Sequence, residues 1–282
     1  QFSDLIDFLS NENLLSADEW IEKARLDTLS EGDIVLTFDD GLRCQIDVAL
    51  PVLEQRDLKA CWFVYSGVFE GQVVQMEIYR YFRTTQFDDV DDFYDAFESE
   101  IGEQFPDILK RPDVKFFDPN AYLTNCPFYS TSDRRFRYFR DQVLGPGQYF
   151  TLMNTMISTA QISIENISKS LWMEDADLVN LAKQGHVVGL HSYSHPTQLV
   201  EMPAREQMHE YENNQRHLTK VLGFTPRIMS HPCNSYSRRT LQILEELGVD
   251  IGFRADMEMA EKGALEFPRE DHAIVLGRMA NQ

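Results

Sequence analysis

Residues 34–41 read Ile-Val-Leu-Thr-Phe-Asp-Asp-Gly, a short apolar run that ends in two adjacent carboxylates and a glycine. The length and β-branching of the run predict a buried strand over Ile34–Phe38. Parallel α/β barrels carry their active sites at the carboxyl ends of their strands, so Asp39 and Asp40 are candidate site residues. One carboxylate can bind a metal while the other holds a water. The competing interpretation is a plain turn, because Asp-Gly is a strong turn pair and Asp caps helices.

A second polar motif, His-Ser-Tyr-Ser-His, occupies residues 191–195 directly after the apolar run Val187–Leu190. Two imidazoles four residues apart can reach one ion if the segment turns into a helix. One aspartate and two histidines leave an open coordination position, as a catalytic zinc-type centre needs. A third motif, Ser-His-Pro-Cys-Asn-Ser-Tyr-Ser over 230–237, also follows a predicted strand. Its loop can line a pocket and present a backbone N–H to an oxyanion.

The rest of the chain alternates between short apolar runs and helical patterns. Further strands are predicted over Cys61–Tyr65, Arg227–Ser230, Ile251–Phe253 and Ile274–Leu276. Helices are predicted over Asp47–Arg56, Asp175–Gln184, Pro203–Leu222 and Arg238–Leu247. This alternation favours parallel βα units in a barrel or a doubly wound sheet.

The aromatic and charged segment from about Ser66 to Phe150 breaks that rhythm and is too long for an ordinary loop. We expect an insertion within a single domain over 1–282, with helices over Asp89–Glu100 and Asp133–Leu144. An arginine cluster lies in the second of these helices. It can hold a phosphate, or it can form a solvated helix face that pairs with the acidic run 88–95. The cluster consists of Arg134, Arg135, Arg137 and Arg140.

Composition excludes several classes of protein. The 282 residues are 43% hydrophobic, which is enough for a core and excludes disorder as the dominant state. The formal net charge of -20 argues against nucleic-acid binding and against an anionic membrane surface. The sequence has no apolar run of about 18 or more residues, so no transmembrane helix is predicted. The four cysteines form no Cys-x-x-Cys pair, so the simplest expectation is a reduced, cytoplasmic setting. They are Cys44, Cys61, Cys126 and Cys233.

The motifs, in this order and each after a strand, resemble those of the polysaccharide deacetylase (NodB homology) family of carbohydrate esterases. Thr-Phe-Asp-Asp-Gly over 37–41 matches the first family motif, and 191–195 matches the second, His-[Ser/Thr]-x-x-His. The resemblance covers about residues 30–70 and 170–280. It implies a distorted (β/α) barrel of about seven parallel strands, with the insertion at about 66–150 left unaccounted for.

The resemblance also implies roles for the first two motifs. Asp39 is expected to be the general base. Asp40, His191 and His195 are expected to bind one divalent metal. Zinc is the first choice for two histidines and one aspartate, with Co, Ni or Mn as alternatives.

The later family motifs fit less well. The third, Arg-x-Pro-Tyr, aligns with 230–233, so the arginine that orients the base and the tyrosine are missing. Pro232 and the backbone N–H of Cys233 remain candidate substrate contacts. The fourth motif, with Asp and Trp, is not visible. The fifth motif, Leu-x-His, supplies the general acid in the family. His272 is a candidate for this role but lacks the preceding leucine, and His231 is a competing candidate. The alternative interpretation of either residue is a surface or loop histidine without a catalytic role.

These expectations point to a metal-dependent hydrolase that removes an acetyl or formyl group from the nitrogen of an amino sugar. The expected substrate is a small, nucleotide- or lipid-linked sugar of surface-polysaccharide biosynthesis, with the insertion closing one side of the site. The alternative is a catalytically reduced member that binds carbohydrate or a protein partner. The missing Arg and Trp motifs favour the alternative, whereas intact Asp39 and the three metal ligands count against it.

Overall fold

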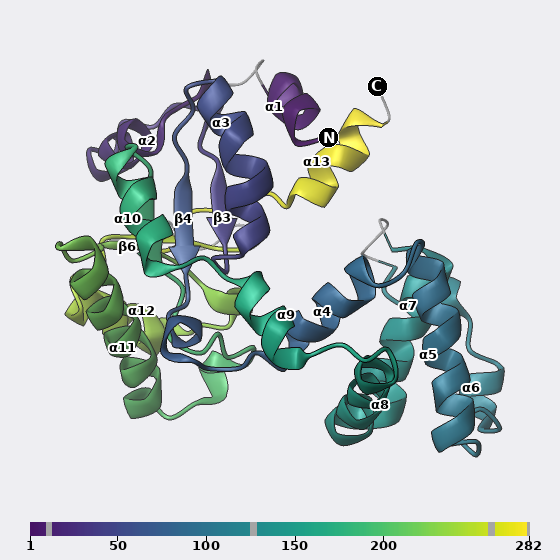
Figure 1. Cartoon of the computed structure of the whole chain (residues 1–282). Coiled ribbons are helices and arrows are strands. Elements are labelled where there is room, and N and C mark those ends of the chain that lie inside the picture. The colour runs from purple at the N-terminus through teal and green to yellow at the C-terminus, as the bar shows by residue number, and fades with distance from the viewer. Residues whose placement is uncertain (10–12, 125–128, 259–262, 281–282) are drawn as a thin grey trace. The chain divides into compact units, whose positions relative to one another are not determined.

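The computed structural model divides into two packed units (Figure 1). The first unit combines Gln1–Val73 with Trp172–Gln282, and the second is Val74–Leu171. The second unit therefore contains most of the segment expected to be an insertion. The structure describes residues 1–9, 13–124, 129–258 and 263–280. Cys126 lies outside these residues.

The first unit is built around a curled parallel sheet in the order β3-β4-β5-β6-β7. Its strands are β3 (Thr37–Asp39), β4 (Cys61–Val64), β5 (Val187–Leu190), β6 (Ile228–Ser230) and β7 (Ile251–Phe253). A separate parallel pair joins β1 (Asn13–Leu14) to β2 (Asp33–Ile34). Because all five strands of the larger sheet run the same way, their carboxyl ends meet at one edge. The candidate motifs follow β3, β5 and β6 at that edge.

Three strand predictions need correction. The strand predicted over Ile34–Phe38 is divided, because Asp33–Ile34 form β2 of the smaller sheet and Thr37–Asp39 form β3 of the larger one. Among the described residues the curled sheet has five strands, whereas the resemblance implies about seven. The predicted strand Ile274–Leu276 lies inside helix α13 (His272–Met279). The side chain of Asp271 accepts a hydrogen bond from the backbone N–H of Ala273 and caps this helix. A three-residue apolar run is compatible with either structure, so periodicity alone cannot decide between them.

The other predicted helices of this unit are found within a few residues of their expected ends. The longer helices are α1 (Phe2–Leu9), α2 (Ala17–Arg25), α3 (Leu50–Gln55), α10 (Asp175–Lys183), α11 (Ala204–Leu222) and α12 (Arg238–Glu246). The short turns are η1 (Gln45–Ala49), η2 (Gly67–Glu70), η5 (Leu199–Glu201) and η6 (Pro232–Asn234). Helix α11 ends at Gly223, which adopts φ 80° as a left-handed cap.

The sheet separates two apolar clusters, because successive side chains of a strand point to opposite faces. Trp62 and Val64 of β4 belong to one cluster, which includes Leu178, Leu218 and other residues of the helices. Cys61 and Phe63 belong to the other, which α2 covers with Trp20 and Ile21. The sheet is thus buried on both faces, as expected for parallel strands.

All the regular secondary structure in the described residues of the second unit is helical. Its helices are α4 (Gln75–Thr85), α5 (Val90–Gln104), α6 (Pro112–Lys115), α7 (Thr131–Tyr138), α8 (Gly145–Thr159) and α9 (Ile164–Leu171), with turns η3 (Pro119–Ala121) and η4 (Phe139–Leu144). Buried aromatic rings form its core, including Phe93, Phe97, Phe136 and Tyr149. The two helices predicted in this segment correspond to α5 and to α7 with η4.

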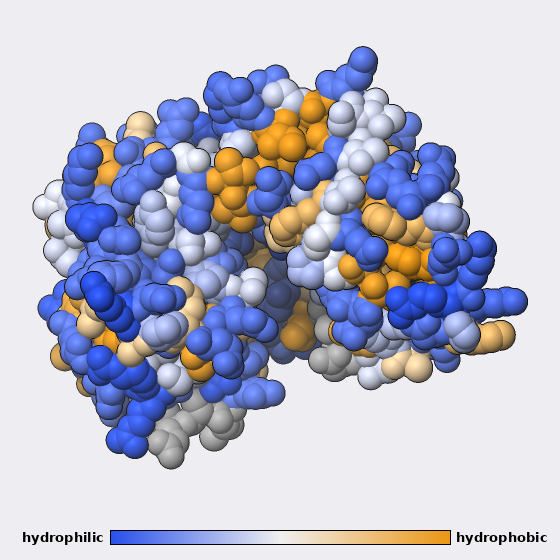
Figure 2. Space-filling view, turned by 90° about the horizontal axis from the view of Figure 1, so that it is seen from below, coloured by the Kyte–Doolittle hydropathy of each residue, from blue (hydrophilic) through white to orange (hydrophobic). Residues whose placement is uncertain are grey.

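The surface agrees with the charged composition. Hydrophilic residues cover most of the face shown in Figure 2, and apolar residues appear on it in patches. Within the ranges that the structure describes, no helix is both long and apolar enough to cross a membrane. The three described cysteines form no disulfide with one another.

Candidate active site

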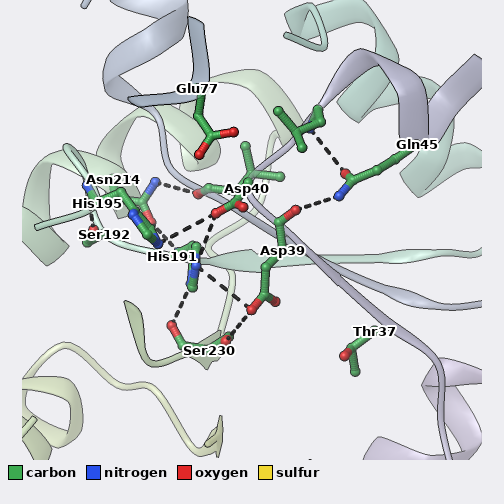
Figure 3. Close-up of polar contacts among 12 residues, drawn as sticks. Thr37, Asp39, Asp40, Gln45, Glu77, His191, Ser192, His195, Asn214 and Ser230 are labelled. Carbon is green, nitrogen blue, oxygen red and sulfur yellow. Dashed lines mark hydrogen bonds and ion pairs between the residues drawn. The ribbon is translucent and has the colours of Figure 1, made fainter. Parts of the chain in front are cut away.

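Three side chains from two strand ends converge in the first unit (Figure 3). Asp40 follows β3, and His191 and His195 follow β5. The Nε2 atoms of both histidines lie 3.5 Å from Oδ1 of Asp40. One potential ligand atom from each residue lies within 4.8 Å of the others, which suits a single metal ion. The structure therefore brings together the three residues expected to bind the metal.

The ring of His191 has a fixed orientation. Its Nδ1 lies 2.8 Å from the backbone oxygen of Ser230, and its side chain is almost fully buried. A carbonyl oxygen can only accept, so Nδ1 of the neutral ring must donate this hydrogen bond. The lone pair then resides on Nε2, the atom that faces Asp40. Such outer contacts select the tautomer that a metal ligand needs.

The loops that carry these residues have an unusual backbone. Asp40, Ser192 and His195 adopt φ values of 79°, 66° and 55°. Non-glycine residues rarely enter this left-handed region, and each such residue costs about 1–3 kcal/mol. Gly41 also has a positive φ, of 78°, and a Cβ there would lie 2.9 Å from Cγ1 of Val64. Two of the three candidate ligands, Asp40 and His195, thus have a positive φ, and such strain is often found at functional sites.

Helix α11 supports the loop between the two histidines. The carboxylate of Glu210 accepts hydrogen bonds from the backbone N–H groups of Tyr193 and Ser194, at 3.0 and 2.8 Å. The amide of Asn214 accepts from the N–H of His191 at 3.0 Å and donates to the oxygen of Val64 at 2.9 Å. Sequence analysis missed both residues.

A signal for Asn214 exists in the sequence. The buried stripe of α11 includes Gln207, Tyr211 and Leu218, and Asn214 falls on it at helical spacing. A buried amide requires polar partners, so its presence there predicts contacts with a neighbouring loop.

Asp39 is held by an arginine from a distant part of the chain. The guanidinium of Arg269 donates to Oδ1 and Oδ2 of Asp39, at 2.7 Å each. It also donates to Oγ of Ser230 at 2.7 Å, and that hydroxyl lies 3.2 Å from Oδ2 of Asp39. Bidentate pairing of this kind fixes both charge and geometry.

The third motif lacks its arginine, as the sequence indicates, because Ser230 stands where the family has arginine. A guanidinium from another part of the chain, Arg269 in the segment before α13, pairs with Asp39 instead. Sequence analysis did not identify Arg269. No local spacing links position 269 to position 39.

Neighbouring charges set the ionisation of the site. Burial by itself would raise the pKa of Asp39, but Arg269 and His191 outweigh it and lower this pKa to about 2. Burial also opposes ionisation of Asp40, while His191 and His195 lower its pKa overall. For His191, burial favours the neutral ring, but the carboxylates of Asp39 and Asp40 raise its pKa above the ordinary value.

Replacing Arg269 by Met should lower kcat/KM by about 10–100-fold, since charged hydrogen bonds contribute about 1.5–3 kcal/mol each. Without the guanidinium the pKa of Asp39 should rise, because burial then acts against fewer opposing charges. The acidic limb of the pH–rate profile should move to higher pH. Arg278→Met is the matched control, because Arg278 is half exposed and pairs with Glu270. Unchanged rates and an unchanged profile in Arg269→Met would contradict the assignment.

The two candidate general acids are placed less favourably. His231 is fully buried, its ring stacks on Tyr236 at 4.0 Å, and its Nε2 contacts the oxygen of Leu265 at 2.8 Å. Burial lowers its pKa to about 3, so this ring is neutral and cannot donate a proton as an imidazolium. His272 begins α13 with its side chain 77% exposed and contacts Asp271. Both placements fit the alternative of loop or surface histidines.

Pro232 and Cys233 form part of turn η6, directly after β6. Pro232 is buried, and Cys233 has φ 51° in the left-handed region. Ser230, two residues before Pro232, reaches Asp39. This places the backbone of the turn at the same sheet edge as Asp39. The role of the Cys233 N–H toward an oxyanion stays a prediction.

The sequence profile of the polysaccharide deacetylase family matches residues 27–111 and 154–252, more than half of the chain. No curated protein matches the chain.

Three solved structures share its fold. The deacetylase PplD from Streptococcus pyogenes is 16% identical with a TM-score of 0.53, and the match covers 94% of this chain and 76% of that one. The BpsB deacetylase domain from Bordetella bronchiseptica is 13% identical with a TM-score of 0.54, covering 95% of this chain and 82% of that one. IcaB from Ammonifex degensii is 16% identical with a TM-score of 0.53, covering 100% of this chain and 88% of that one.

Proposed function

This chain belongs to the polysaccharide deacetylase family of hydrolases, and on that premise we propose that it hydrolyses the N-acyl amide of an amino sugar with a divalent metal. The observation that carries the proposal is the convergence of Asp40, His191 and His195 beside the Asp39–Arg269 pair. A pure binding protein has no need of a part-buried carboxylate held next to three candidate metal ligands. The acyl group is acetyl or formyl.

The donor set fits the proposed metal. Two imidazole nitrogens and one carboxylate oxygen are typical of catalytic zinc sites and leave a position open for water. The oriented Nε2 of His191 and the lowered pKa of Asp40 both favour the protonation states that ligands require. Zinc is our first choice, with Co, Ni or Mn as alternatives. When bound, the ion would act as a Lewis acid toward water and the amide oxygen.

The remaining residues have roles in positioning and proton transfer. Asp39 accepts a proton from the attacking water, and Arg269 with Ser230 holds its carboxylate in place. The backbone N–H of Cys233 donates to the developing oxyanion. Because His231 is buried with a lowered pKa and the side chain of His272 is largely exposed, we assign proton transfer to the departing nitrogen to Asp39, which passes on the proton it has taken from water. A protonated carboxyl of low pKa gives up this proton readily.

The runner-up function is a catalytically reduced member that binds carbohydrate or a partner. It gained support from the missing arginine, and Arg269 removes that support. The substrate remains a proposal drawn from the sequence: a small, nucleotide- or lipid-linked amino sugar used in cytoplasmic steps of surface-polysaccharide synthesis.

Release of acetate or formate tests the proposal. The zinc-loaded protein is incubated with UDP-N-acetylglucosamine, N-acetylglucosamine, a chito-oligomer and the N-formyl counterpart of the monosaccharide. We expect metal-dependent release, faster from the small or nucleotide-linked sugar than from the oligomer. Faster turnover as the oligomer lengthens would contradict the substrate class. Sugar binding without release from any compound would favour the runner-up.

Metal affinity should weaken as pH falls. A metal binds only the neutral imidazole, and the pKa of His191 is raised above 6.5 by Asp39 and Asp40. Protons therefore compete with the metal at a higher pH than they would at an ordinary histidine. Zinc titrations at several pH values should show an affinity that already weakens above pH 6.5 and decreases further as the pH is lowered. An affinity that is flat from neutral to mildly acidic pH would contradict this prediction.

A further inference from the structure

The helical second unit contains a small cavity lined by four arginines. Its volume is about 60 Å³, and its polar lining consists of Arg80, Arg83, Arg137, Arg140, Tyr79 and Tyr149. The other lining side chains are apolar, and no acidic residue lines it among those that the structure describes. In a chain of net charge -20 such a concentration of guanidinium groups is unexpected. All of these residues lie within Val74–Leu171.

The acidic partners around the cavity do not balance these charges. Arg80 pairs with Glu77 at 2.9 Å, and Arg140 pairs with Asp141 at 2.6 Å. Arg83 and Arg137 share a single carboxylate, that of Asp133. Four positive groups thus face three negative ones.

Asp133 is also heavily used. Its Oδ1 accepts from the hydroxyl of Tyr94 at 2.9 Å and from Nε of Arg137 at 3.2 Å. Nη1 of Arg83 lies 3.8 Å from the same oxygen, beyond hydrogen-bond distance. Arg83 is therefore the least satisfied of the four arginines.

The environment of Arg83 points the same way. Its Nε is buried and has no hydrogen-bond partner in the described residues. Its guanidinium carbon lies 5.4 Å from the ring centre of Phe136, and that of Arg140 lies 5.9 Å from the same ring. Stacking on an aromatic ring holds a guanidinium in place but does not satisfy its N–H groups. A buried donor of this kind normally has a partner, either water or a ligand.

We propose that this cavity is a binding site for a phosphoryl or similar tetrahedral oxyanion. A phosphoryl group carries several oxygens and up to two negative charges, and convergent guanidinium groups bind such an oxyanion through parallel N–H···O contacts. The cavity volume of about 60 Å³ is several times the roughly 10–15 Å³ that one water needs on the same measure, so a small oxyanion has room. A larger ligand would enter with its phosphoryl group alone. Two members of the arginine cluster singled out in the sequence, Arg137 and Arg140, contribute to this site.

The other interpretation of that cluster needs revision. Three of its arginines, Arg135, Arg137 and Arg140, pair with Glu98, Asp133 and Asp141, which lie outside the acidic run 88–95. Arg134 instead donates to the backbone oxygens of Tyr122 and Tyr129.

The test is calorimetric titration of the zinc-loaded full chain with inorganic phosphate at constant ionic strength. We expect saturable binding below about 10 mM. Arg83→Gln should weaken it at least about 10-fold, the usual effect of losing one charged hydrogen bond. Arg80→Gln removes the most exposed lining arginine with little risk to folding and should weaken binding several-fold. Arg111→Gln is the matched control: it is partly exposed, pairs with Asp113 and does not line the cavity, so it should bind phosphate like the wild type.

A further variant separates this site from the metal ligands. Asp40→Asn should retain phosphate binding, and its loss there would overturn the proposal, as would the absence of saturable binding or wild-type affinity in both Arg83→Gln and Arg80→Gln. N-acetylglucosamine 1-phosphate binding more tightly than phosphate would identify a phosphorylated sugar as the source of the oxyanion. Equal affinity would identify the free ion. The deacetylase proposal does not depend on the outcome.

Discussion

Asp39→Asn should lower turnover by about 10²–10⁴-fold, the usual contribution of general acid–base catalysis. Asparagine keeps the shape of the side chain but cannot accept the proton from the attacking water. The low pKa of Asp39 keeps the wild-type carboxylate ionised throughout the working pH range, so the loss should appear at every pH. Steady-state release of acetate measures it.

The metal content of this variant distinguishes the two adjacent carboxylates. Asp40 faces both histidines, whereas Asp39 is occupied by Arg269. Asp39→Asn should therefore keep its zinc. Asp250→Asn is the matched control, since Asp250 also forms a two-point pair with an arginine, Arg25, and is exposed to the same degree. Loss of zinc from Asp39→Asn would mean that the two carboxylate roles are exchanged.

Sequence patterns predicted those features of the site that are local. The motif at 37–41 contains the end of strand β3 and the motif at 191–195 directly follows β5. A parallel sheet must bring such strand ends to one edge. This fixes the neighbourhood of Asp40 and the two histidines without any knowledge of the remaining chain. Likewise, the strands over Val187–Leu190 and Ile251–Phe253 match their predicted bounds, because apolar runs between clear turn signals define both.

The features that failed depend on contacts between distant segments. Arg269 reaches Asp39 across 230 positions, and no spacing rule relates them. Glu210 lies on helix α11 and accepts hydrogen bonds from the loop between the two histidines. Packing against the rest of the first unit sets how this helix is rotated about its axis, so its sequence alone does not show that Glu210 faces the loop. One wrong prediction has a local cause: the run Ile274–Leu276 is apolar enough for a strand, but Asp271 caps a helix that includes it. The burial of His231, which lowers its pKa to about 3, also could not be predicted from its position in the sequence.

Asp40→Ala should abolish metal binding and activity together. The mutation removes one of three ligands, and loss of even an outer-shell partner typically lowers metal affinity by about 10–100-fold, so a larger loss is expected here. It also removes the charge that helps to raise the pKa of His191, but two imidazoles alone make a poor site for zinc at micromolar concentration. Elemental analysis should fall from about one ion per chain to well below it.

Asp57→Ala serves as the control for Asp40→Ala, because Asp57 is almost fully exposed and pairs only with Lys59 among its described ion pairs. It should keep both zinc and turnover. Both aspartates have a positive φ, 79° at Asp40 and 51° at Asp57, which alanine disfavours. The temperature of thermal unfolding without metal should therefore be lowered to a similar degree in the two variants, which would attribute the lost activity to the missing ligand and not to misfolding. An Asp40→Ala protein that still binds one zinc per chain with unchanged affinity would remove this aspartate from the ligand set. The mechanism would then have to be rebuilt around Asp39, whose two oxygens already accept from Arg269.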